Sequence, residues 1–261
     1  MAQVTLLIDG DVEAFKASAV SQEVIPWDDD ISTTEIDPKG AEDYLVSALA
    51  SYRENLMADR LIVCLTADEN WRKQLWPDYK ANRKDKERPV LLGHCRDFLR
   101  THYEVECWPR LEADDVMGIL SQTIPGSIIV SVDKDMRTVP CRLYNPGRPN
   151  EGVVRVDDVL AHEWHMTQTL TGDTVDGYKG CPGIGPKKAA QVVQEVFDQV
   201  NPIQNYSTWR SELWTAVVNM YEAKEMSVDD AVMNARLAYI LRHPHEYNRK
   251  TSKLKLWQPP T

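Results

Sequence analysis

The sequence predicts an α/β protein built on a central, mostly parallel sheet. Three short apolar runs are typical of buried strands: Val4 to Ile8, Leu61 to Leu65 and Ser127 to Val132. Helical patterns stand between these runs, and strands that alternate with helices form parallel βαβ units. We therefore expect the first two thirds of the chain to form an α/β core with helices on the sheet.

The helices between those strands are marked by caps and by the spacing of their apolar residues. Asp37 and Pro38 supply a cap and a first helical residue. The apolar face that follows has the helical period. It consists of Ala41, Tyr44, Leu45, Ala48, Leu49, Tyr52 and Leu56. Further along, the sequence predicts a helix from Pro89 to about Tyr103, a short extended segment from Glu104 to Trp108, and a helix from Glu112 to Thr123.

Beyond Asn201 the sequence predicts two amphipathic helices whose apolar faces belong to a core. The first face has Trp209, Leu213, Val217 and Tyr221, and the second has Ala231, Ala235, Ala238 and Leu241. A basic run follows at Arg249, Lys250, Lys253 and Lys255. Contact with DNA is slightly preferred over simple solvation for that run.

Composition excludes several classes of protein. The 261 residues are 43% hydrophobic, and no apolar run approaches the roughly 18 residues that span a membrane. No basic segment precedes the first apolar run, so we expect a strand there, no signal peptide and a cytoplasmic location. Five scattered cysteines without a C-x-x-C pair argue against a disulfide framework and a structural zinc site, and are expected to be buried.

The distribution of charge points to a phosphate-binding surface in spite of the net charge of −10. From Trp71 to Arg88 seven basic residues stand against three acids, a local balance of +4, so the rest of the chain carries −14. Carboxylates in a few short motifs and cations gathered elsewhere suggest a metal site beside a phosphate-binding surface. A solvated helix face is an equally good explanation of the basic stretch taken alone.

Carboxylates follow the predicted strands at four separate strand ends. They are Asp9 and Asp11, then Asp68, then Glu112, Asp114 and Asp115, then Asp133 and Asp135. The carboxyl ends of parallel strands share one edge of a sheet, where functional groups collect. A single acid here is commonly a helix cap or a first-turn residue, as Asp114 or Asp115 alone would be. Acids at four strand ends favour bound cations, because so many carboxylates gathered without counter-ions would repel one another. An all-oxygen ligand set favours Mg²⁺ or Mn²⁺ over zinc.

Three other motifs carry less weight. The stretch from Gly180 to Lys187 resembles a Walker A loop, but its lysine is one place late and no Ser or Thr follows. His162 and His165 are three residues apart, which does not match the zinc-protease spacing, so we expect surface residues of a helix. Gly183 and Gly185 lack the third glycine of a dinucleotide fingerprint.

The order of the motifs resembles the flap endonuclease and 5′→3′ exonuclease superfamily over nearly the whole chain. The motifs are IDGD at Ile8 to Asp11, Asp68, YKANR at Tyr79 to Arg83, LEADD at Leu111 to Asp115, SVDKD at Ser131 to Asp135, and GDTVDGYKGCPGIGPKKAAQ at Gly172 to Gln191. Three others, NWRK at Asn70 to Lys73, DDVMG at Asp114 to Gly118 and ARLAYILR at Ala235 to Arg242, look most like the exonucleases of short-tailed bacteriophages.

The resemblance implies a PIN-like nuclease core and a set of metal-binding carboxylates. These are Asp9, Asp68, Glu112, Asp114, Asp115, Asp133, Asp135, Asp173 and Asp176. They would bind two or more Mg²⁺ ions, for which Mn²⁺ can substitute, in a two-metal hydrolysis. Whether Asp11 binds metal is left open, because many relatives have a neutral residue there.

Residues that contact DNA are also implied by the resemblance. Lys80 and Arg83 match the catalytic cations that face the reacting phosphate, with Lys84 beside them on the DNA. Tyr79 is either a base-stacking residue or a core tyrosine. The glycine-rich segment matches a helix-three-turn-helix, in which Gly183, Gly185, Lys187 and Lys188 contact the DNA backbone. Gly180, Cys181, Gly183 and Ile184 would form its K⁺-binding turn.

We therefore expect residues 1–170 to form the nuclease core, with a basic arch segment at about 71–110, and residues 171–261 to form the helix-three-turn-helix and C-terminal helical region. The expected activity is a 5′→3′ exonuclease on double-stranded DNA with a 5′ end, gap or flap, with flap endonuclease and RNA-primer-removing activity on an RNA–DNA hybrid. No membrane partner is expected, and the location would be the host cytoplasm if a phage encodes the chain. The alternative is a non-catalytic protein of the same fold that binds DNA junctions.

Overall fold

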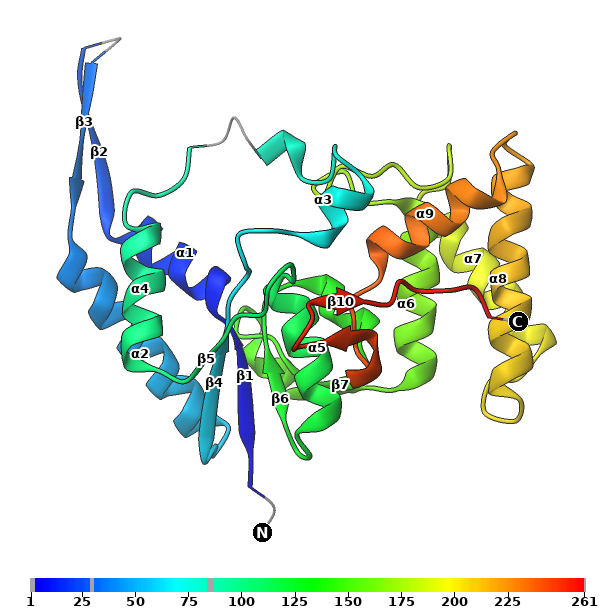
Figure 1. Ribbon diagram of the computed structural model, residues 1–261, viewed down its shortest axis with the longest axis horizontal. Helices are drawn as coiled ribbons and strands as arrows, with labels where there is room; N and C mark the ends of the chain where they lie inside the picture. The colour runs from blue at the N-terminus through cyan, green and yellow to red at the C-terminus, as the bar shows by residue number, and fades with distance from the viewer. Residues whose placement is uncertain (1–2, 29–30, 84–86, 261) are drawn as a thin grey trace. The chain divides into compact units, whose positions relative to one another are not determined.

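The computed structural model describes residues 3–28, 31–83 and 87–260 of the chain. The chain divides into two compact units. The first consists of Met1–Glu69, Lys86–Asp133 and Cys141–Val154, and the second of Asn70–Asp85, Lys134–Pro140 and Arg155–Thr261. The first unit is built on a sheet, and the second is mainly helical (Figure 1).

The sheet of the first unit is mostly parallel, with the strand order β5-β4-β1-β6-β7-β8. The strands are β1 (Thr5–Asp9), β4 (Arg60–Cys64), β5 (Val105–Glu106), β6 (Ile128–Val130), β7 (Cys141–Tyr144) and β8 (Val153–Val156). β1 pairs in parallel with β4 and with β6, and the pairs β4–β5 and β6–β7 are parallel as well. The predicted fold class, an α/β core on a mostly parallel sheet, is confirmed.

Helices cover both faces of this sheet. They are α1 (Gly10–Val20), α2 (Pro38–Asn55), α4 (Leu92–His102) and α5 (Ala113–Thr123). α1, α2 and α4 pack together on one face, while α5 contacts β1 and β4. Because successive strand residues point to opposite faces, Leu6 and Ile8 meet the three helices and Leu7 points the other way. All five residues of β1 are buried as a result.

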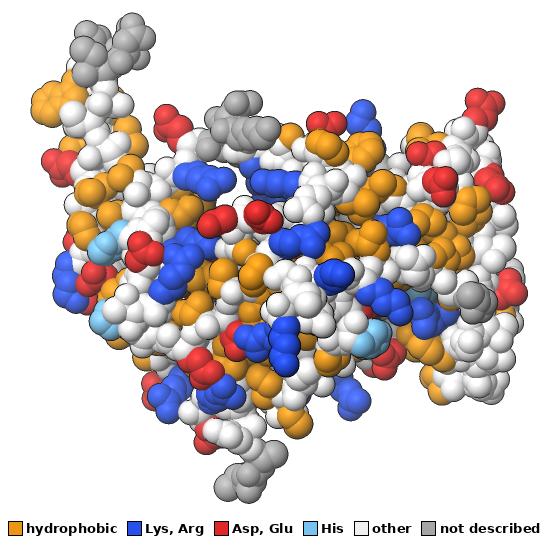
Figure 2. Space-filling view, viewed as in Figure 1, with side chains coloured by type: hydrophobic (Ala, Val, Ile, Leu, Met, Phe, Trp, Pro, Cys, Tyr) orange, Lys and Arg blue, Asp and Glu red, His pale blue; other side chains and the backbone are white. Residues whose placement is uncertain are grey.

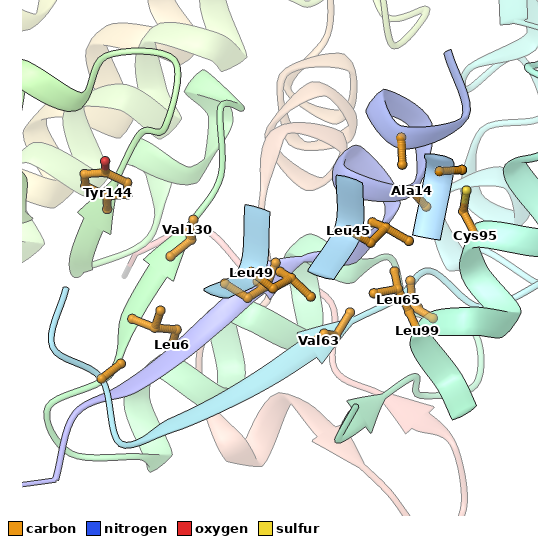
Figure 3. Packing of buried hydrophobic residues seen from close by; sticks show 14 of the residues in the cluster. Leu6, Ala14, Leu45, Leu49, Val63, Leu65, Cys95, Leu99, Val130 and Tyr144 are labelled. Atoms are coloured by element: carbon orange, nitrogen blue, oxygen red, sulfur yellow. The ribbon is translucent and has the colours of Figure 1, made fainter. Parts of the chain in front are cut away.

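The main core lies between the sheet and the three helices. Figure 3 shows Leu6, Val63 and Val130 of the strands beside Leu45 and Leu49 of α2. All five side chains are at most 2% exposed. The apolar face predicted for residues 37–56 therefore forms one wall of this core.

Of the helix starts predicted at Asp37 and at Pro89, only the first has a side-chain cap, and only the first is placed correctly. α2 begins where expected, since the Asp37 carboxylate accepts the Gly40 N–H over 2.8 Å. α4 begins at Leu92 and not at Pro89. Pro89 forms a turn instead, in which its carbonyl oxygen accepts the Leu92 N–H over 3.1 Å.

The second unit is a group of helices around α6. Its long helices are α6 (Asp158–Thr171), α7 (Pro186–Gln199), α8 (Tyr206–Glu222) and α9 (Val228–Ala238). Its short elements are α3 (Trp71–Leu75), η1 (Ala81–Arg83), η2 (Lys134–Thr138), η4 (Pro244–Glu246), β9 (Tyr247–Asn248) and β10 (Lys253–Leu254). α6 contacts α7, α8 and α9. The two predicted tail faces are buried on α8 and α9, although Leu241 lies beyond the end of α9.

The prediction that His162 and His165 are surface residues of a helix is wrong. Both lie on α6, but His162 is 4% exposed and His165 is fully buried. They lie on the side of α6 that packs against Trp209 and Tyr239, with ring centroids 5.4 Å from His162 to Trp209 and 5.2 Å from His165 to Tyr239. Their spacing predicts that the two histidines share one face of the helix, but it does not predict whether that face is exposed or buried.

A projecting hairpin between α1 and α2 was not among the predicted elements. β2 (Gln22–Asp28) and β3 (Ile31–Ile36) pair antiparallel as a separate two-stranded sheet. Val24 and Trp27 are 57% and 69% exposed, and Figure 2 shows hydrophobic side chains along this hairpin at its upper left.

The first unit also contains a short 3₁₀ helix, η3 (Pro149–Glu151).

The prediction that the cysteines are buried holds for three of the five. Cys64, Cys95 and Cys181 are buried as expected, but Cys107 is exposed and Cys141 is half-buried. Among the helices of the described residues, none is long and apolar enough to cross a membrane.

Candidate active site

Asp9 is a buried carboxylate at the carboxyl end of β1, where it is 4% exposed. Its Oδ1 accepts the Val12 N–H over 3.1 Å and so caps α1, and its Oδ2 accepts the Ser131 hydroxyl over 2.9 Å. Burial raises the pKa of Asp9 to about 7, with a further contribution from the charges of Asp11 and Asp133. Asp9 thus lies where several negative groups gather.

Ser131 connects the ends of β1 and β6. Its hydroxyl donates to Asp9, and its oxygen accepts the Asp133 N–H over 3.1 Å. This arrangement holds the half-buried Asp133 beside Asp9 at the edge of the sheet. Asp68 follows β4 at the same edge and is exposed. The sequence offered Ser131 only as part of a motif, without a role.

Asp11 is engaged by neighbouring protein groups. Its Oδ2 accepts the Thr66 N–H over 2.7 Å, and its Oδ1 lies 3.0 Å from Arg96 Nη1. Arg96 also donates to the Thr66 carbonyl over 2.6 Å. These contacts connect α1 to the loop after β4 and to α4. The sequence left open whether Asp11 binds metal, and the structure gives this residue a structural role.

Glu112 and Asp115 cap the start of α5 reciprocally. The Glu112 side chain accepts the Asp115 N–H, and Asp115 Oδ2 accepts the Glu112 N–H over 3.4 Å. Glu112 is 6% exposed and Asp115 is fully buried, while Asp114 follows in the first helical turn. These contacts show that Glu112 and Asp115 cap the start of α5.

The predicted carboxylates are divided between the two units. Asp9, Asp68, Glu112, Asp114, Asp115 and Asp133 belong to the first unit, and Asp135, Asp173 and Asp176 to the second. Within the described ranges, no three His, Cys, Asp or Glu side chains are arranged closely enough to hold a metal ion. The first unit does bring Asp9, Asp11 and Asp133 close enough for their charges to interact.

Asp135 and Asp173 are held by polar neighbours in the second unit. Asp135 Oδ1 accepts from Gln168 Nε2 on α6 over 2.6 Å. Asp173 lies 3.1 Å from Lys134 Nζ and accepts the N–H groups of Val175 and Asp176. Burial opposes ionisation of Asp173, but Lys134 and the two N–H groups outweigh it, so the pKa of Asp173 lies below its ordinary value.

Asp176 contacts three side chains of the motif that was predicted to face the DNA. Its carboxylate accepts the Tyr79 hydroxyl over 2.9 Å and Arg83 Nη2 over 2.7 Å, and Lys80 Nζ lies 3.6 Å away. The Lys80 N–H also donates to the Asp176 carbonyl over 2.8 Å. Lys80 has a positive φ of 56°, a conformation that this backbone bond helps to hold. The predicted Lys84 lies outside the described residues.

The glycine-rich turn leads into α7. Gly185 is the N-cap of α7 and Pro186 its first residue, with no side chain capping the helix. The N-terminal N–H groups of α7 therefore have no side-chain acceptor at the cap and suit an anion. Lys187 and Lys188 are exposed in this first turn. Gly183 has a φ of 73° and open space around it, so a ligand backbone can come close.

The predicted potassium turn is tied to the helices behind it. Cys181 and Ile184 are buried, the Cys181 carbonyl accepts the Ile184 N–H over 3.1 Å, and the Cys181 thiol donates to the Met220 carbonyl over 3.3 Å. The Gly180 N–H donates to Asn234 Oδ1 over 3.0 Å. These contacts anchor the turn to α8 and α9 of the second unit.

Comparison with known proteins gives one family match and two long relatives. A family model described as 5′-3′ exonuclease, N-terminal resolvase-like domain, matches residues 4–146. The chain is 29% identical to an exonuclease of Escherichia phage T7, over 97% of this chain and 93% of that protein. It is also 29% identical to an exodeoxyribonuclease of Enterobacteria phage T3, over 97% and 92%.

Among solved structures, one of T5 5′-exonuclease with divalent metal ions (zinc) bound has a similar fold. Its TM-score is 0.63, its sequence identity 16%, and the match covers 92% of this chain and 90% of that one. At this identity the likeness concerns the fold. It agrees with the sheet order and with the helical C-terminal region described above.

Proposed function

The chain belongs to the 5′→3′ exonuclease family, which confirms the predicted resemblance, and on this premise we propose that it hydrolyses DNA from a 5′ end with divalent metal ions. The prediction of an enzyme is confirmed by the same family membership. A non-catalytic junction-binding protein is the less favoured alternative. The proposed substrates are double-stranded DNA with a 5′ end, gap or flap, and an RNA–DNA hybrid.

The observation that carries the proposal is the buried carboxylate of Asp9 beside two others. Asp9 accepts hydrogen bonds from Val12 and Ser131, and in the described part of the chain it forms no ion pair with Lys or Arg. Its pKa of about 7 reflects burial first and the charges of Asp11 and Asp133 next. A bound cation would offset both effects, and oxygen donors of this kind suit Mg²⁺ with Mn²⁺ as a substitute.

We assign metal binding to the predicted carboxylates of each unit separately. In the first unit these are Asp9, Asp68, Glu112, Asp114, Asp115 and Asp133, and in the second Asp135, Asp173 and Asp176. Two bound metals would activate a water molecule and neutralise charge on the reacting phosphate. The protein's own contribution is to hold the ligands: Ser131 orients Asp9 and Asp133, and Gln168 orients Asp135.

Lys80 and Arg83 are proposed to contact the reacting phosphate. Asp176 holds both cations, at 3.6 Å and 2.7 Å, which limits their freedom before a substrate arrives. A cation that is already fixed stabilises developing negative charge more than a mobile one, because no reorganisation is needed during the reaction. Tyr79 then acts as a packing residue that helps to fix Asp176.

The turn before α7 is proposed to grip the DNA backbone away from the reacting bond. Gly183 and Gly185 leave room for a phosphodiester, and Lys187 and Lys188 add charge at the helix N-terminus. Such contacts fix position without reading sequence. A K⁺ ion at the carbonyl groups of residues 180–184 would bridge the turn to DNA.

A panel of labelled substrates tests the function. Duplex, gapped, flapped and RNA–DNA substrates carrying a 5′ label should release labelled mononucleotides or short oligonucleotides first, and only with Mg²⁺ or Mn²⁺ present. Initial release from the 3′ end, or hydrolysis that persists in excess chelator, would refute the proposal.

A further inference from the structure

A cluster of cationic and aromatic side chains lies in the second unit and contains none of the residues proposed for catalysis. The arginine–histidine cluster consists of Arg210, Arg242, His162, His165, Tyr206, Trp209 and Tyr239. It joins α6, α8 and the segment that follows α9. Because none of these residues is a proposed metal ligand or DNA contact, the inference goes beyond the proposed function.

Ring contacts link the members of the arginine–histidine cluster into one chain. The Arg242 guanidinium lies 4.4 Å from the Tyr239 ring centroid, and the Tyr239 ring lies 5.2 Å from His165. His165 is 6.2 Å from His162, which is 5.4 Å from Trp209. The chain of contacts ends with Trp209 to Tyr206 at 5.8 Å and Tyr206 to the Arg210 guanidinium at 5.6 Å.

This cluster holds all the buried side-chain nitrogens that have no hydrogen-bond partner in the described residues. They are Arg242 Nε and Nη2, Arg210 Nε, His162 Nε2, His165 Nδ1 and Trp209 Nε1. Buried polar atoms in folded proteins nearly always have partners. Six exceptions along one series of contacting side chains therefore point to a missing ligand.

Arg242 shows what kind of ligand is missing. It is 7% exposed, and among the described residues its guanidinium forms no ion pair with Asp or Glu. Arginine cannot escape the cost of burial by losing its proton. The nearby Glu246 carboxylate is occupied by the Tyr239 hydroxyl and by the backbone N–H groups of Arg242 and His243. A water molecule would satisfy the donors but would leave the positive charge uncompensated, whereas an anion does both.

His165 narrows the chemistry of the anion. Its Nε2 lies 2.8 Å from the Ala235 carbonyl, which can only accept, so Nε2 carries the proton and Nδ1 is an acceptor. The ligand must then offer acceptors to the arginines and to Trp209, and a donor to His165. Hydrogenphosphate has both, since three oxygens accept and the P–O–H group donates.

We propose that the arginine–histidine cluster binds one phosphate ion, with Arg242 Nε and Nη2 donating to two of its oxygens. Such a paired geometry is what arginine offers to phosphate. His165 and Trp209 are fully buried, so a duplex backbone cannot enter and a small free ion is the occupant. The ion would connect α6, α8 and the segment after α9, so it stabilises the helical unit.

Thermal unfolding of the full-length chain tests the site. Inorganic phosphate is titrated at pH 7.5 against sodium chloride of equal ionic strength, which controls for general salt effects. The expected result is a saturable rise in Tm of about 3–6 °C when phosphate reaches ten times its Kd. A response no larger than that of chloride would overturn the proposal.

Two arginine variants locate the response. Arg242→Met keeps volume but removes the charge, and should abolish the phosphate-dependent rise in Tm. Arg155→Met, the same change at an exposed arginine, should retain it. If Arg242→Met does not fold, Arg210→Met replaces it and is expected to weaken phosphate binding at least tenfold. Equal responses in the cluster variant and in Arg155→Met would contradict the assignment.

Two further measurements identify the ion. Broadening of the ³¹P signal of inorganic phosphate by the wild-type chain, and not by the Arg242 variant, would show binding directly. A deoxynucleoside 5′-monophosphate should raise Tm less than phosphate does, because the site is enclosed. If the nucleotide stabilises the chain and phosphate alone does not, the free-ion proposal is wrong.

Discussion

Tyr79 donates a hydrogen bond from its hydroxyl to Asp176 Oδ2 over 2.9 Å, with its ring 3% exposed. Arg83 pairs with the other oxygen of the same carboxylate over 2.7 Å. One acid therefore holds the start and the end of the segment from Tyr79 to Arg83. Of the two roles that the sequence left open for Tyr79, base stacking and packing, the structure favours packing.

Tyr79→Phe should remove this hydrogen bond while keeping the ring packed. We expect the free energy of unfolding to fall by about 1 kcal/mol, the usual contribution of one hydrogen bond, because the carboxylate keeps its pairing with Arg83. Urea unfolding measures the change. Tyr44→Phe, at a half-buried tyrosine of α2, is the control and should change stability by less than about 0.5 kcal/mol. Equal losses of stability in both variants would show that the hydrogen bond from Tyr79 to Asp176 does not stabilise the chain.

Asp133→Asn should stop cutting without unfolding the chain. The change removes a proposed metal ligand and should lower the single-turnover rate on the order of 100-fold or more. Stability should hold or rise, because a negative neighbour of Asp9 is lost while the backbone N–H of residue 133 still donates to Ser131. Asp229→Asn, at an exposed acid of α9, should keep full activity. Unchanged cutting by the Asp133 variant would exclude that residue as a ligand.

Gly180→Ala should destabilise the chain more than Gly183→Ala. Both glycines have positive φ, 65° and 73°, but a Cβ on Gly180 would lie 2.2 Å from the Gly172 nitrogen, whereas Gly183 has nothing within 4 Å. We expect a loss of about 3 kcal/mol or more at Gly180 and about 1–2 kcal/mol at Gly183. Chemical denaturation of both variants checks the order. A larger loss at Gly183 would mean that the close backbone approach at Gly180 is not a constraint.

Strands and acid positions could be predicted from the sequence because both depend on local patterns. The run from Val4 to Ile8 is apolar except for Thr5 because β1 is covered on both faces, and Asp9 follows it directly. Ser131, Thr66 and Arg96 could not be assigned roles, because each acts on a residue far away in the sequence. Long-range pairing of ordinary polar residues leaves no periodic signal.

The error over His162 and His165 has a similar origin. Their spacing of three places them on one face of α6, and the sequence does not say whether that face meets solvent or α8. The hairpin β2–β3 was missed because the segment lacks an Asn-Gly or Asp-Gly turn and contains a proline and several acids, which are uncommon in strands.

The buried histidines should make the chain sensitive to acid. Burial, followed by the charges of Arg242 and Arg210, lowers the pKa of His165 to about 3, and burial also places the pKa of His162 well below its ordinary value. Below about pH 6.5 the unfolded chain takes up protons that the folded chain does not. Stability should therefore fall as the pH drops from about 6.5 toward 3, by up to about 1.4 kcal/mol per pH unit for each histidine, and should gain nothing from them above 6.5.

Urea unfolding between pH 7.5 and 5 measures this slope. His165→Gln retains a side-chain N–H for the Ala235 carbonyl but cannot titrate, so its stability should depend less steeply on pH. His94→Gln, at an exposed histidine of α4, should leave the slope close to that of the wild-type chain. Identical slopes for the wild type and the His165 variant would show that His165 titrates normally in the folded state.

Lysine substitutions should separate binding of the DNA backbone from hydrolysis of the DNA. Lys187 and Lys188 are exposed at the start of α7, whereas Lys80 is held near Asp176. Replacing Lys187 and Lys188 together by Ala should weaken duplex binding at every sequence and reduce the log-log salt slope by roughly 0.9 per lost phosphate contact. Turnover at saturating DNA should change little. Lys80→Ala should leave affinity nearly intact and lower the single-turnover rate, because its charge matters most in the transition state.

Affinity in Ca²⁺, which we expect to permit binding without cutting, and single-turnover rates in Mg²⁺ separate the two effects. Lys39→Ala, at an exposed lysine of α2, is the control and should alter neither quantity. If Lys80→Ala loses affinity as much as rate, its charge contributes to ground-state binding and not selectively to the transition state. If the double variant loses rate at saturating DNA, the turn before α7 also positions the reacting bond, and the proposed division between gripping and cutting is wrong.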